Sequence, residues 1–391
     1  MISRNLRHLR LLLAVHDTGS LSEAALRVHV SQPAVTQAIG KLETQAGGAL
    51  FERTRQGFFP TERGAALSKR VRRAFALLDP ALSEISPRLT LTASAAQLQA
   101  LVAVHETENF TLAARKLGLA QPTVHRAVAQ LEQEADRSLF ERTAFGMVAS
   151  RATRALAIAV MLAFQELEQA AADLAELEGG DAGRIVIGAL PLSRSVLLPQ
   201  ALVRFRQVRP RHAVLVIEGR YDALLGGLRR GDVDVIIGAL RQPAPIEDVM
   251  QERLFDDRLA ILAGNHHPLV GRTDLSRDEL RGYSWVVPRE GAPARDQFDA
   301  FFAERGPPES VIQAGSILLM REILSASDHL GCISSAQARA ELAKGLVSEI
   351  ATGVAWPGRP IGLAYRAGWG PTAAQRLLLD LLRETAKTES L

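Results

Sequence analysis

One segment of the chain occurs twice, at an offset of 89 positions. His16 matches His105 without a gap, and the run LFERT at residues 50–54 recurs at residues 139–143. An alanine pair, a Gln-Pro dipeptide and a Leu-Glu dipeptide recur in the same register, so a chance match is negligible. The 391-residue chain therefore contains two copies of one small module, followed by a region with a different sequence pattern.

Residues 31–45 of the first copy (SQPAVTQAIGKLETQ) predict a helix with one buried side. Ser31 is a good N-cap, and Pro33 lies in the first turn, where its missing N–H costs nothing. Apolar residues recur from Val35 at i, i+3, i+4 and i+7, which predicts a single buried stripe. The polar residues left on the outward side are Gln32, Thr36, Gln37 and Lys41.

Two further signals flank this helix. A second short helix precedes it, opened by a capping box in which Ser20 is followed by Glu23. Residues 50–61 predict a two-stranded wing with Arg53 and Arg55 near its tip. Such a helix can enter the major groove of DNA, with Gln and Thr at base edges and basic residues at phosphates. The alternative is an ordinary helical hairpin in a core.

The pattern resembles the winged helix-turn-helix of LysR-type transcriptional regulators. The resemblance rests on Ala24-Ala25, SQPAV at residues 31–35, Leu42-Glu43 and LFER at residues 50–53. The family usually has one such module, whereas this chain has two. The resemblance implies double-stranded DNA as a partner. The predicted DNA-contacting residues are Ser31, Gln32, Pro33, Thr36, Gln37, Lys41, Arg53 and Arg55 in the first copy, and Gln121, Thr123, His125, Arg126 and Arg142 in the second.

The two copies differ in charge. Residues 1–88 hold 13 basic and 7 acidic residues, whereas residues 91–180 hold 7 basic and 11 acidic residues. In the second copy Ala120 replaces the Ser31 cap, and Ala144-Phe145 replaces the basic wing tip. We therefore expect the first copy to be the principal DNA reader and the second to assist. The alternatives are a second copy that is mainly a spacer, and the reverse assignment.

Each copy is followed by a predicted helix. Residues 64–85 suggest a truncated linker helix cut by Pro80 and Pro87. Its three arginines, at positions 70, 72 and 73, are expected on a solvated face, with phosphate contact as the alternative. Residues 152–177 contain no Gly or Pro and carry a long apolar stripe. The family resemblance implies that this helix pairs with its twin in a second subunit; packing on its own chain is the alternative.

The rest of the chain predicts an α/β fold. A flexible joint at residues 178–183 is followed by apolar strand runs that alternate with helices, which implies a mostly parallel sheet. Later segments resemble the two-lobed effector domain of the family, a fold shared with periplasmic binding proteins. The predicted fold is therefore multi-domain, with two winged helix-turn-helix domains (1–64 and 95–151), a truncated linker helix (65–94), a long linker or dimerisation helix (152–178), and an effector domain (183–388) whose first lobe is about 183–257 and 367–388 and whose second is about 258–366.

A cleft between two lobes predicts a ligand site, because ligands of open α/β sheets bind beyond the carboxyl ends of strands. Ser193 could cap a helix or donate to an anion, and Arg194 could neutralise a carboxylate; helix caps and surface charge are the alternative. By resemblance, small organic acids or sugar-derived acids are suitable effectors. The predicted effector-binding residues are Pro191, Leu192, Ser193, Arg194, Arg220, Tyr221, Pro288 and Arg289.

Catalytic and metal chemistry find little support in the sequence. No G-x-S-x-G elbow, H-E-x-x-H or phosphate-binding Walker loop is present, and His266-His267 lacks an obvious third ligand. Cys332, the single cysteine, cannot form an internal disulfide and lies in an apolar run, so we expect it to be buried and inert rather than redox-sensing. No enzyme activity, metal or cofactor is expected.

The expected protein is a cytoplasmic LysR-type regulator that acts as a homodimer or homotetramer on DNA. A small-molecule effector controls it, RNA polymerase is allowed as a further partner, and the absence of a signal sequence or an 18-residue apolar run argues against a membrane. The rival is a cytosolic solute-binding α/β protein whose winged helices serve assembly.

Overall fold

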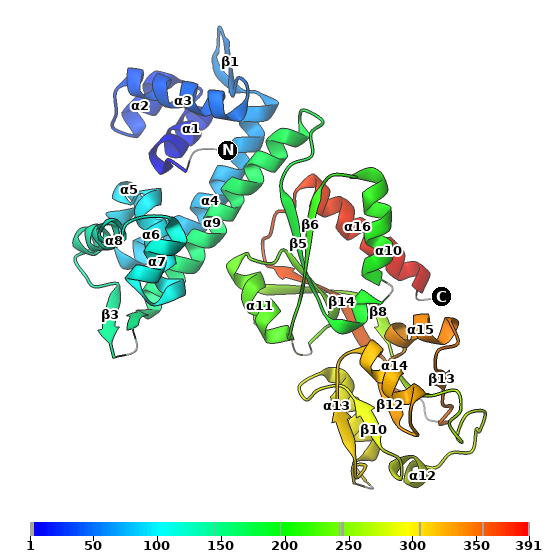
Figure 1. Cartoon of the computed structure of the whole chain (residues 1–391). Coiled ribbons are helices and arrows are strands. Elements are labelled where there is room, and N and C mark those ends of the chain that lie inside the picture. The colour runs from blue at the N-terminus through cyan, green and yellow to red at the C-terminus, as the bar shows by residue number, and fades with distance from the viewer. Residues whose placement is uncertain are drawn as a thin grey trace. The chain divides into compact units, whose positions relative to one another are not determined.

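The computed structural model divides into two compact units, Met1–Gly183 and Arg184–Leu391 (Figure 1). It describes residues 4–144, 146–195, 197–241, 243, 246–304, 306–353 and 356–389. The joint between the units contains Gly179 and Gly183 with positive φ values of 68° and 88°, a conformation that glycine adopts without steric cost.

The first module consists of three helices and a hairpin. The helices are α1 (Leu6–Thr18), α2 (Leu21–Arg27) and α3 (Gln32–Ala46), and the hairpin pairs β1 (Phe51–Thr54) with β2 (Gly57–Pro60). Ser20 caps α2 by accepting from the Glu23 amide. Ser31 stands at the N-cap of α3 but makes no side-chain cap hydrogen bond, so the expected cap interaction is absent.

The second module repeats this order of elements. After the short α5 (Leu89–Thr92) come α6 (Ala95–Thr107), α7 (Phe110–Leu117), α8 (Gln121–Ala135) and a hairpin of β3 (Phe140–Thr143) with β4 (Gly146–Ala149). The hairpin turns show the same constraint in both modules. Gly57 and Gly146 each have φ of 135°, and a Cβ there would lie 2.6 or 2.7 Å from the carbonyl oxygen of Gly19 or Glu108. Only glycine fits these two positions.

Two long helices, one after each module, pack against each other. They are α4 (Glu62–Ile85) and α9 (Arg151–Glu176), and their buried residues belong to one core that both modules share. Pro80 lies inside α4, so the expected break at Pro80 is wrong. The helix tolerates this proline near its carboxyl end and has 24 residues. Helix α9 packs on its own chain, the alternative to pairing with a twin.

The first lobe of the second unit is a five-stranded mixed sheet. Strand β5 (Arg184–Ala189) pairs in parallel with β6 (Ala213–Glu218) and β7 (Val235–Ala239), whereas β14 (Arg359–Arg366) runs antiparallel between β7 and β8 (Val249–Asp257). The short η1 (Pro191–Arg194), α10 (Leu197–Val208), α11 (Tyr221–Arg230) and α16 (Ala373–Glu389) complete this lobe. Residues 359–366 were expected in the second lobe. That boundary is wrong, because β14 fills the gap between β7 and β8.

The second lobe has its own five-stranded sheet, in the order β11-β10-β12-β9-β13. Its core contains Trp285, whose ring packs edge-on against Phe298 and Phe302. The chain crosses between the lobes after β8 and before β14, and the buried Arg359 and Asp257 pair at these crossings. The elements are β9 (Leu259–Ala263), α12 (Arg277–Arg281), β10 (Trp285–Val287), α13 (Pro293–Phe302), β11 (Val311–Gln313), α14 (Ile317–Ser325), β12 (Leu330–Ser334), α15 (Ser335–Ala343) and β13 (Ser348–Glu349).

Among the described helices, α9 passes the length and hydropathy test for a membrane span. This corrects the expectation that the sequence holds no apolar run of 18 residues. More than half of its apolar window is buried inside the protein, as in a core helix.

Candidate nucleic-acid interface and effector cleft

The outward side of α3 is fully open to solvent. All the predicted polar residues on it are exposed, while Val35, Ala38 and Leu42 are buried beneath them. The Thr36 hydroxyl donates to the Gln32 carbonyl at 3.2 Å, which fixes its direction along the helix. The exposed set is Ser31, Gln32, Pro33, Thr36, Gln37 and Lys41.

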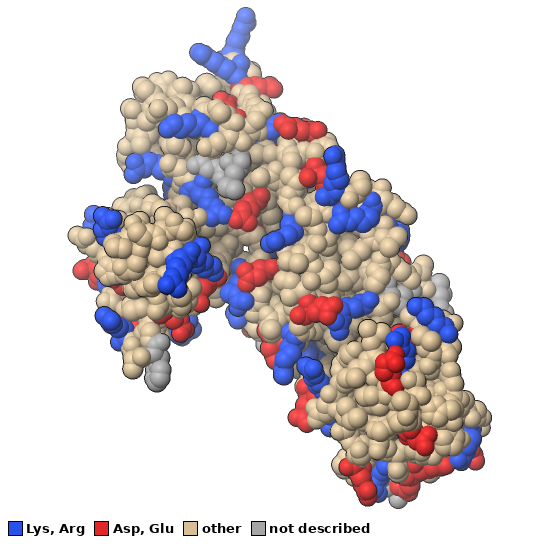
Figure 2. Space-filling model, in the orientation of Figure 1, with Lys and Arg blue, Asp and Glu red and all other residues tan. Residues whose placement is uncertain are grey.

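The wing of the first module carries its basic residues outward. Arg53 lies on β1 opposite Phe58, and Arg55 lies in the turn; both are exposed. Figure 2 shows basic side chains projecting from the hairpin tip, above the body of the module. This arrangement suits phosphate contacts on either side of a groove that admits α3.

The second module exposes the corresponding set. Gln121, Thr123, His125 and Arg126 lie on the open side of α8, and Arg142 is exposed on β3. Two of these side chains have local partners. The His125 ring lies 5.1 Å from the Phe110 ring, and Nε of Arg126 donates to the Pro122 carbonyl at 3.3 Å. The wing position Phe145 lies outside the described residues.

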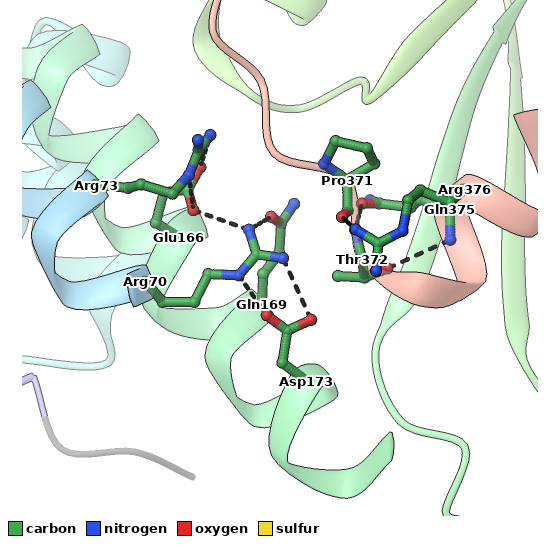
Figure 3. A network of polar contacts seen from close by, with 9 residues as sticks. All are labelled: Arg70, Arg73, Glu166, Gln169, Asp173, Pro371, Thr372, Gln375 and Arg376. Carbon is green, nitrogen blue, oxygen red and sulfur yellow. Dashed lines mark hydrogen bonds and ion pairs between the residues drawn. The ribbon is translucent and has the colours of Figure 1, made fainter. Parts of the chain in front are cut away.

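The arginines of α4 do not form a solvated face. Arg70 is buried, and its guanidinium donates to Glu166 at 2.9 Å, to Gln169 at 2.7 Å and to Asp173 at 2.6 Å (Figure 3). Burial acts to lower the pKa of Arg70, but hydrogen bonds with Asp173 and Glu166 raise it above the ordinary value. Arg73 pairs with Glu166, and Arg72 pairs with Asp17. Both sequence readings are therefore wrong for Arg70 and Arg73, because these residues hold α4 to α9.

The turn after β5 is more enclosed than expected. The Ser193 hydroxyl is buried and donates to the Leu190 carbonyl at 2.8 Å, so it does not cap the following helix. Leu192 is buried with Ala239 and Ile361. Arg194 already pairs with Glu218, so its charge is partly compensated. Pro191 is half-buried at the start of η1, which packs against α15 of the second lobe.

The turn after β6 holds a buried polar group. Arg220 is exposed at the N-cap of α11, whereas the next residue, Tyr221, is buried. Within the described residues, the Tyr221 hydroxyl is buried and has no hydrogen-bond partner. Burial raises the pKa of Tyr221. A buried unpaired hydroxyl costs free energy unless a ligand or water satisfies it.

Arg241 is a candidate site residue that was not predicted from the sequence. It follows β7, its guanidinium carbon lies 4.5 Å from the Tyr221 ring centroid, and Nη2 donates to the Gly291 carbonyl at 3.3 Å. Burial lowers its pKa. Gly291 belongs to the loop after β10 that also contains the half-buried Pro288 and the exposed Arg289. The structure therefore brings Tyr221 and this loop together through Arg241. Its place directly after a strand was the available signal.

Metal and thiol chemistry receive no geometric support here. Among the described residues there is no group of three or more His, Cys, Asp or Glu side chains that could hold a metal ion. Cys332 is fully buried in β12, and burial raises its pKa to about 12. His266 and His267 lie beside Asp328, with His267 buried against Tyr283.

Comparison with known proteins identifies the family. The model of the LysR substrate binding domain matches residues 178–387, and that of the bacterial regulatory helix-turn-helix protein, lysR family, matches both residues 6–65 and residues 95–154. The chain is 34% identical to the HTH-type transcriptional regulator GalR of Pseudomonas putida over 390 residues, 97% of each chain. It is 28% identical to the HTH-type transcriptional regulator PcaQ of Agrobacterium fabrum, over 74% of this chain and 94% of the relative.

A solved structure shares the fold. Full-length OxyR from Pseudomonas aeruginosa has a TM-score of 0.55 and 23% identity, and the match covers 74% of this chain and 98% of that one. A helix-turn-helix module joined to a two-lobed effector-binding unit defines a DNA-binding transcriptional regulator rather than an enzyme. The chain belongs to the LysR family of transcriptional regulators, as its sequence motifs predicted.

The coverage of these matches differs in an informative way. GalR matches nearly the whole chain, whereas the PcaQ and OxyR matches leave about a quarter of it uncovered. One repeat unit spans 89 positions of the 391-residue chain, which is about the share that the PcaQ and OxyR matches leave uncovered. The additional length of this chain is therefore accounted for by one module with its linker helix.

Proposed function

We propose that both modules of this LysR-type regulator bind double-stranded DNA and that a small organic acid in the effector cleft controls it. The main support comes from the first module, because α3 exposes Gln32, Thr36, Gln37 and Lys41 beside a wing that carries Arg53 and Arg55. Exposed Gln and Thr side chains can bond to base edges, and the wing arginines can bond to phosphates. The second module supports it with His125, Arg126 and Arg142 exposed in the matching places.

The surroundings of Tyr221 favour an anionic effector with an oxygen acceptor. Tyr221 offers a buried hydroxyl without a partner in the described structure, and the half-buried Arg241 beside it offers a guanidinium. A carboxylate would accept hydrogen bonds from both groups, and charge-assisted bonds of this kind are the stronger ones. Arg220 and Arg289 are exposed cations on the two loops that meet there.

The effector can act through the lobes because Arg241 spans them. Its bond to the Gly291 carbonyl connects the end of β7 to the loop after β10. A ligand that draws the guanidinium toward itself would change this contact between lobes. It shifts the protein between arrangements only to the extent that it binds them with different affinities.

The remaining parts of the proposal follow from the family. The protein acts in the cytoplasm as a homo-oligomer, with RNA polymerase as a further partner. Its effector unit is of the type shared with periplasmic binding proteins.

Salt-dependent DNA binding tests the proposed function. Full-length protein is titrated against its own upstream DNA and against an unrelated duplex of equal length, using fluorescence anisotropy across a salt series. We expect tighter binding to the upstream DNA, with affinity that falls steeply with salt as phosphate contacts release counterions. Equal, weak binding to both duplexes would instead favour a solute-binding protein whose modules serve assembly.

A further inference from the structure

The sequence repeat continues through the two long helices. At the same offset of 89 positions, five apolar residues of α4 are identical to five apolar residues of α9, and all ten are buried in the shared core. The repeat therefore includes the helix that follows each module. The matched pairs are Leu67 with Leu156, Val71 with Val160, Ala74 with Ala163, Phe75 with Phe164, and Leu78 with Leu167.

The two helices run in opposite directions. Arg63 near the start of α4 pairs with Glu178 just beyond the end of α9, whereas Arg73 further along α4 pairs with Glu166 earlier in α9. Two equivalent stripes packed antiparallel place equivalent faces against each other. This is the geometry of an isologous dimer interface, made here within one chain. The modules lie at opposite ends of the helix pair (Figure 1).

The charged contacts of this interface are not symmetric. In these contacts the basic residues lie on α4 and the acidic residues lie on α9 or just beyond it, as in the pairs of Arg70 with Glu166 and Asp173. At the offset of 89 positions, Arg70 corresponds to Ala159 and Arg73 to Leu162, so α9 has no basic residue at either position. Two α9 helices packed the same way would leave the buried Glu166 without its arginine partners, which is strongly destabilising. The charges thus favour the pairing of α4 with α9 over the pairing of α9 with its own copy.

Residues of the first module reach both helices. Arg10 of α1 pairs with Asp79 of α4 and lies over the Phe75 ring, with the guanidinium carbon 4.1 Å from its centroid. Arg4 pairs with Glu168 of α9, the residue equivalent to Asp79, and lies 4.8 Å over the Phe164 ring. The first module is therefore fixed to the helices of both copies.

We propose that the two modules of one chain form a complete two-headed DNA-reading unit, closed by α4 and α9, that binds a bipartite site with unlike halves. The inference rests on the proposed function, in which both modules bind DNA. The halves differ because α3 presents Thr36 and Gln37 where α8 presents His125 and Arg126. Because α4 already covers the apolar stripe of α9, this stripe does not serve pairing with a second subunit.

Selection of binding sites from random duplex DNA tests the proposal on the full-length chain. The wild type should enrich a site of two unlike halves at fixed spacing. A variant with Ala120→Ser, Thr123→Ala, His125→Thr, Arg126→Gln and Gln130→Lys gives α8 the outward residues of α3 at these positions, all of which are exposed. It should enrich a site whose two halves are alike.

Stoichiometry gives a second test that needs no variant. In a titration well above the dissociation constant, one chain should saturate one duplex carrying the selected site, whatever the oligomeric state. A palindromic or single-half site selected by the wild type, or two chains per duplex, would overturn the inference while leaving DNA binding intact. Absence of any enrichment would overturn both the inference and the proposed function.

Discussion

Arg70 of α4 and Asp173 of α9 lie 103 positions apart in the chain and form a two-point contact, Nε to Oδ2 at 2.6 Å and Nη2 to Oδ1 at 3.2 Å. The pair joins the helix that follows the first module to the helix that follows the second (Figure 3). Glu166 and Gln169 also accept hydrogen bonds from the same guanidinium. The contact has no counterpart at the equivalent positions of the repeat, so it distinguishes one helix from the other.

Removing this guanidinium should destabilise the first unit. Arg70→Met leaves Glu166 buried with one partner fewer, and breaking a buried pair in this way costs about 3 kcal/mol or more. Chemical denaturation of the full-length protein, followed by a probe in the first unit, measures the loss. The matched control is Glu168→Gln, which breaks the exposed pair with Arg4 and should cost about 1 kcal/mol or less.

The double variant Arg70→Asp with Asp173→Arg adds a sharper readout. Reversing the pair should recover part of the loss that Arg70→Asp alone produces, because the two residues are in direct contact. Losses that simply add would show that the pair does not couple the two helices.

The Tyr221 hydroxyl should matter for effector binding and not for stability. Without ligand, Tyr221→Phe removes a buried unpaired group and should be neutral or stabilise the second unit by about 1 kcal/mol. With ligand, the variant should lose affinity. Thermal shift with succinate, benzoate and gluconate as probes measures both effects, with Arg220→Ala as an exposed control in the same turn. If the variant and wild type respond equally to every carboxylate that stabilises the wild type, Tyr221 is only a core residue.

Cys332 should be unreactive in the folded protein. Burial raises the pKa of its thiol to about 12, so the thiolate, which is the reactive form, appears only as the pH approaches that value. At pH 8 a thiol reagent should label the native protein very slowly and the denatured protein completely. Because the sequence has a single cysteine, the signal is unambiguous. Rapid labelling of the native protein would contradict the inert assignment and favour a redox role.

Local signals in the sequence predicted the modules well. Capping residues and apolar periodicity located α2 and α3, and they correctly separated the buried Val35 from the exposed Thr36 and Gln37. Because the second module repeats the sequence of the first, the same helix positions and buried residues were predicted for it. These features depend on residues a few positions apart, so the pattern of the chain is sufficient to predict them.

Long-range packing was the part that the sequence did not show. Pro80 normally ends a helix, yet α4 continues because the surrounding core holds it. Arg70 was expected in solvent because its acidic partners lie about a hundred positions away. Strand β14 was placed in the wrong lobe for a similar reason, since nothing local indicates which sheet a returning strand joins.

The predicted effector-binding residues show the same difference between local and long-range features. The turns after β5 and β6 were found from strand ends, but the inward hydrogen bond of Ser193 and the position of Arg241 over Tyr221 depend on tertiary structure. Candidate residues could be predicted, whereas their actual contacts could not.

The most direct test of the account compares Arg53→Ala and Arg142→Ala with the wild type on the upstream DNA across a salt series. The two arginines occupy equivalent places on the two wings, both exposed. If both modules bind DNA, each variant should weaken binding. Each should also lower the slope of log affinity against log salt concentration by about 1, the value for one lost phosphate contact. A loss confined to Arg53→Ala, with Arg142→Ala indistinguishable from the wild type, would contradict the two-headed account.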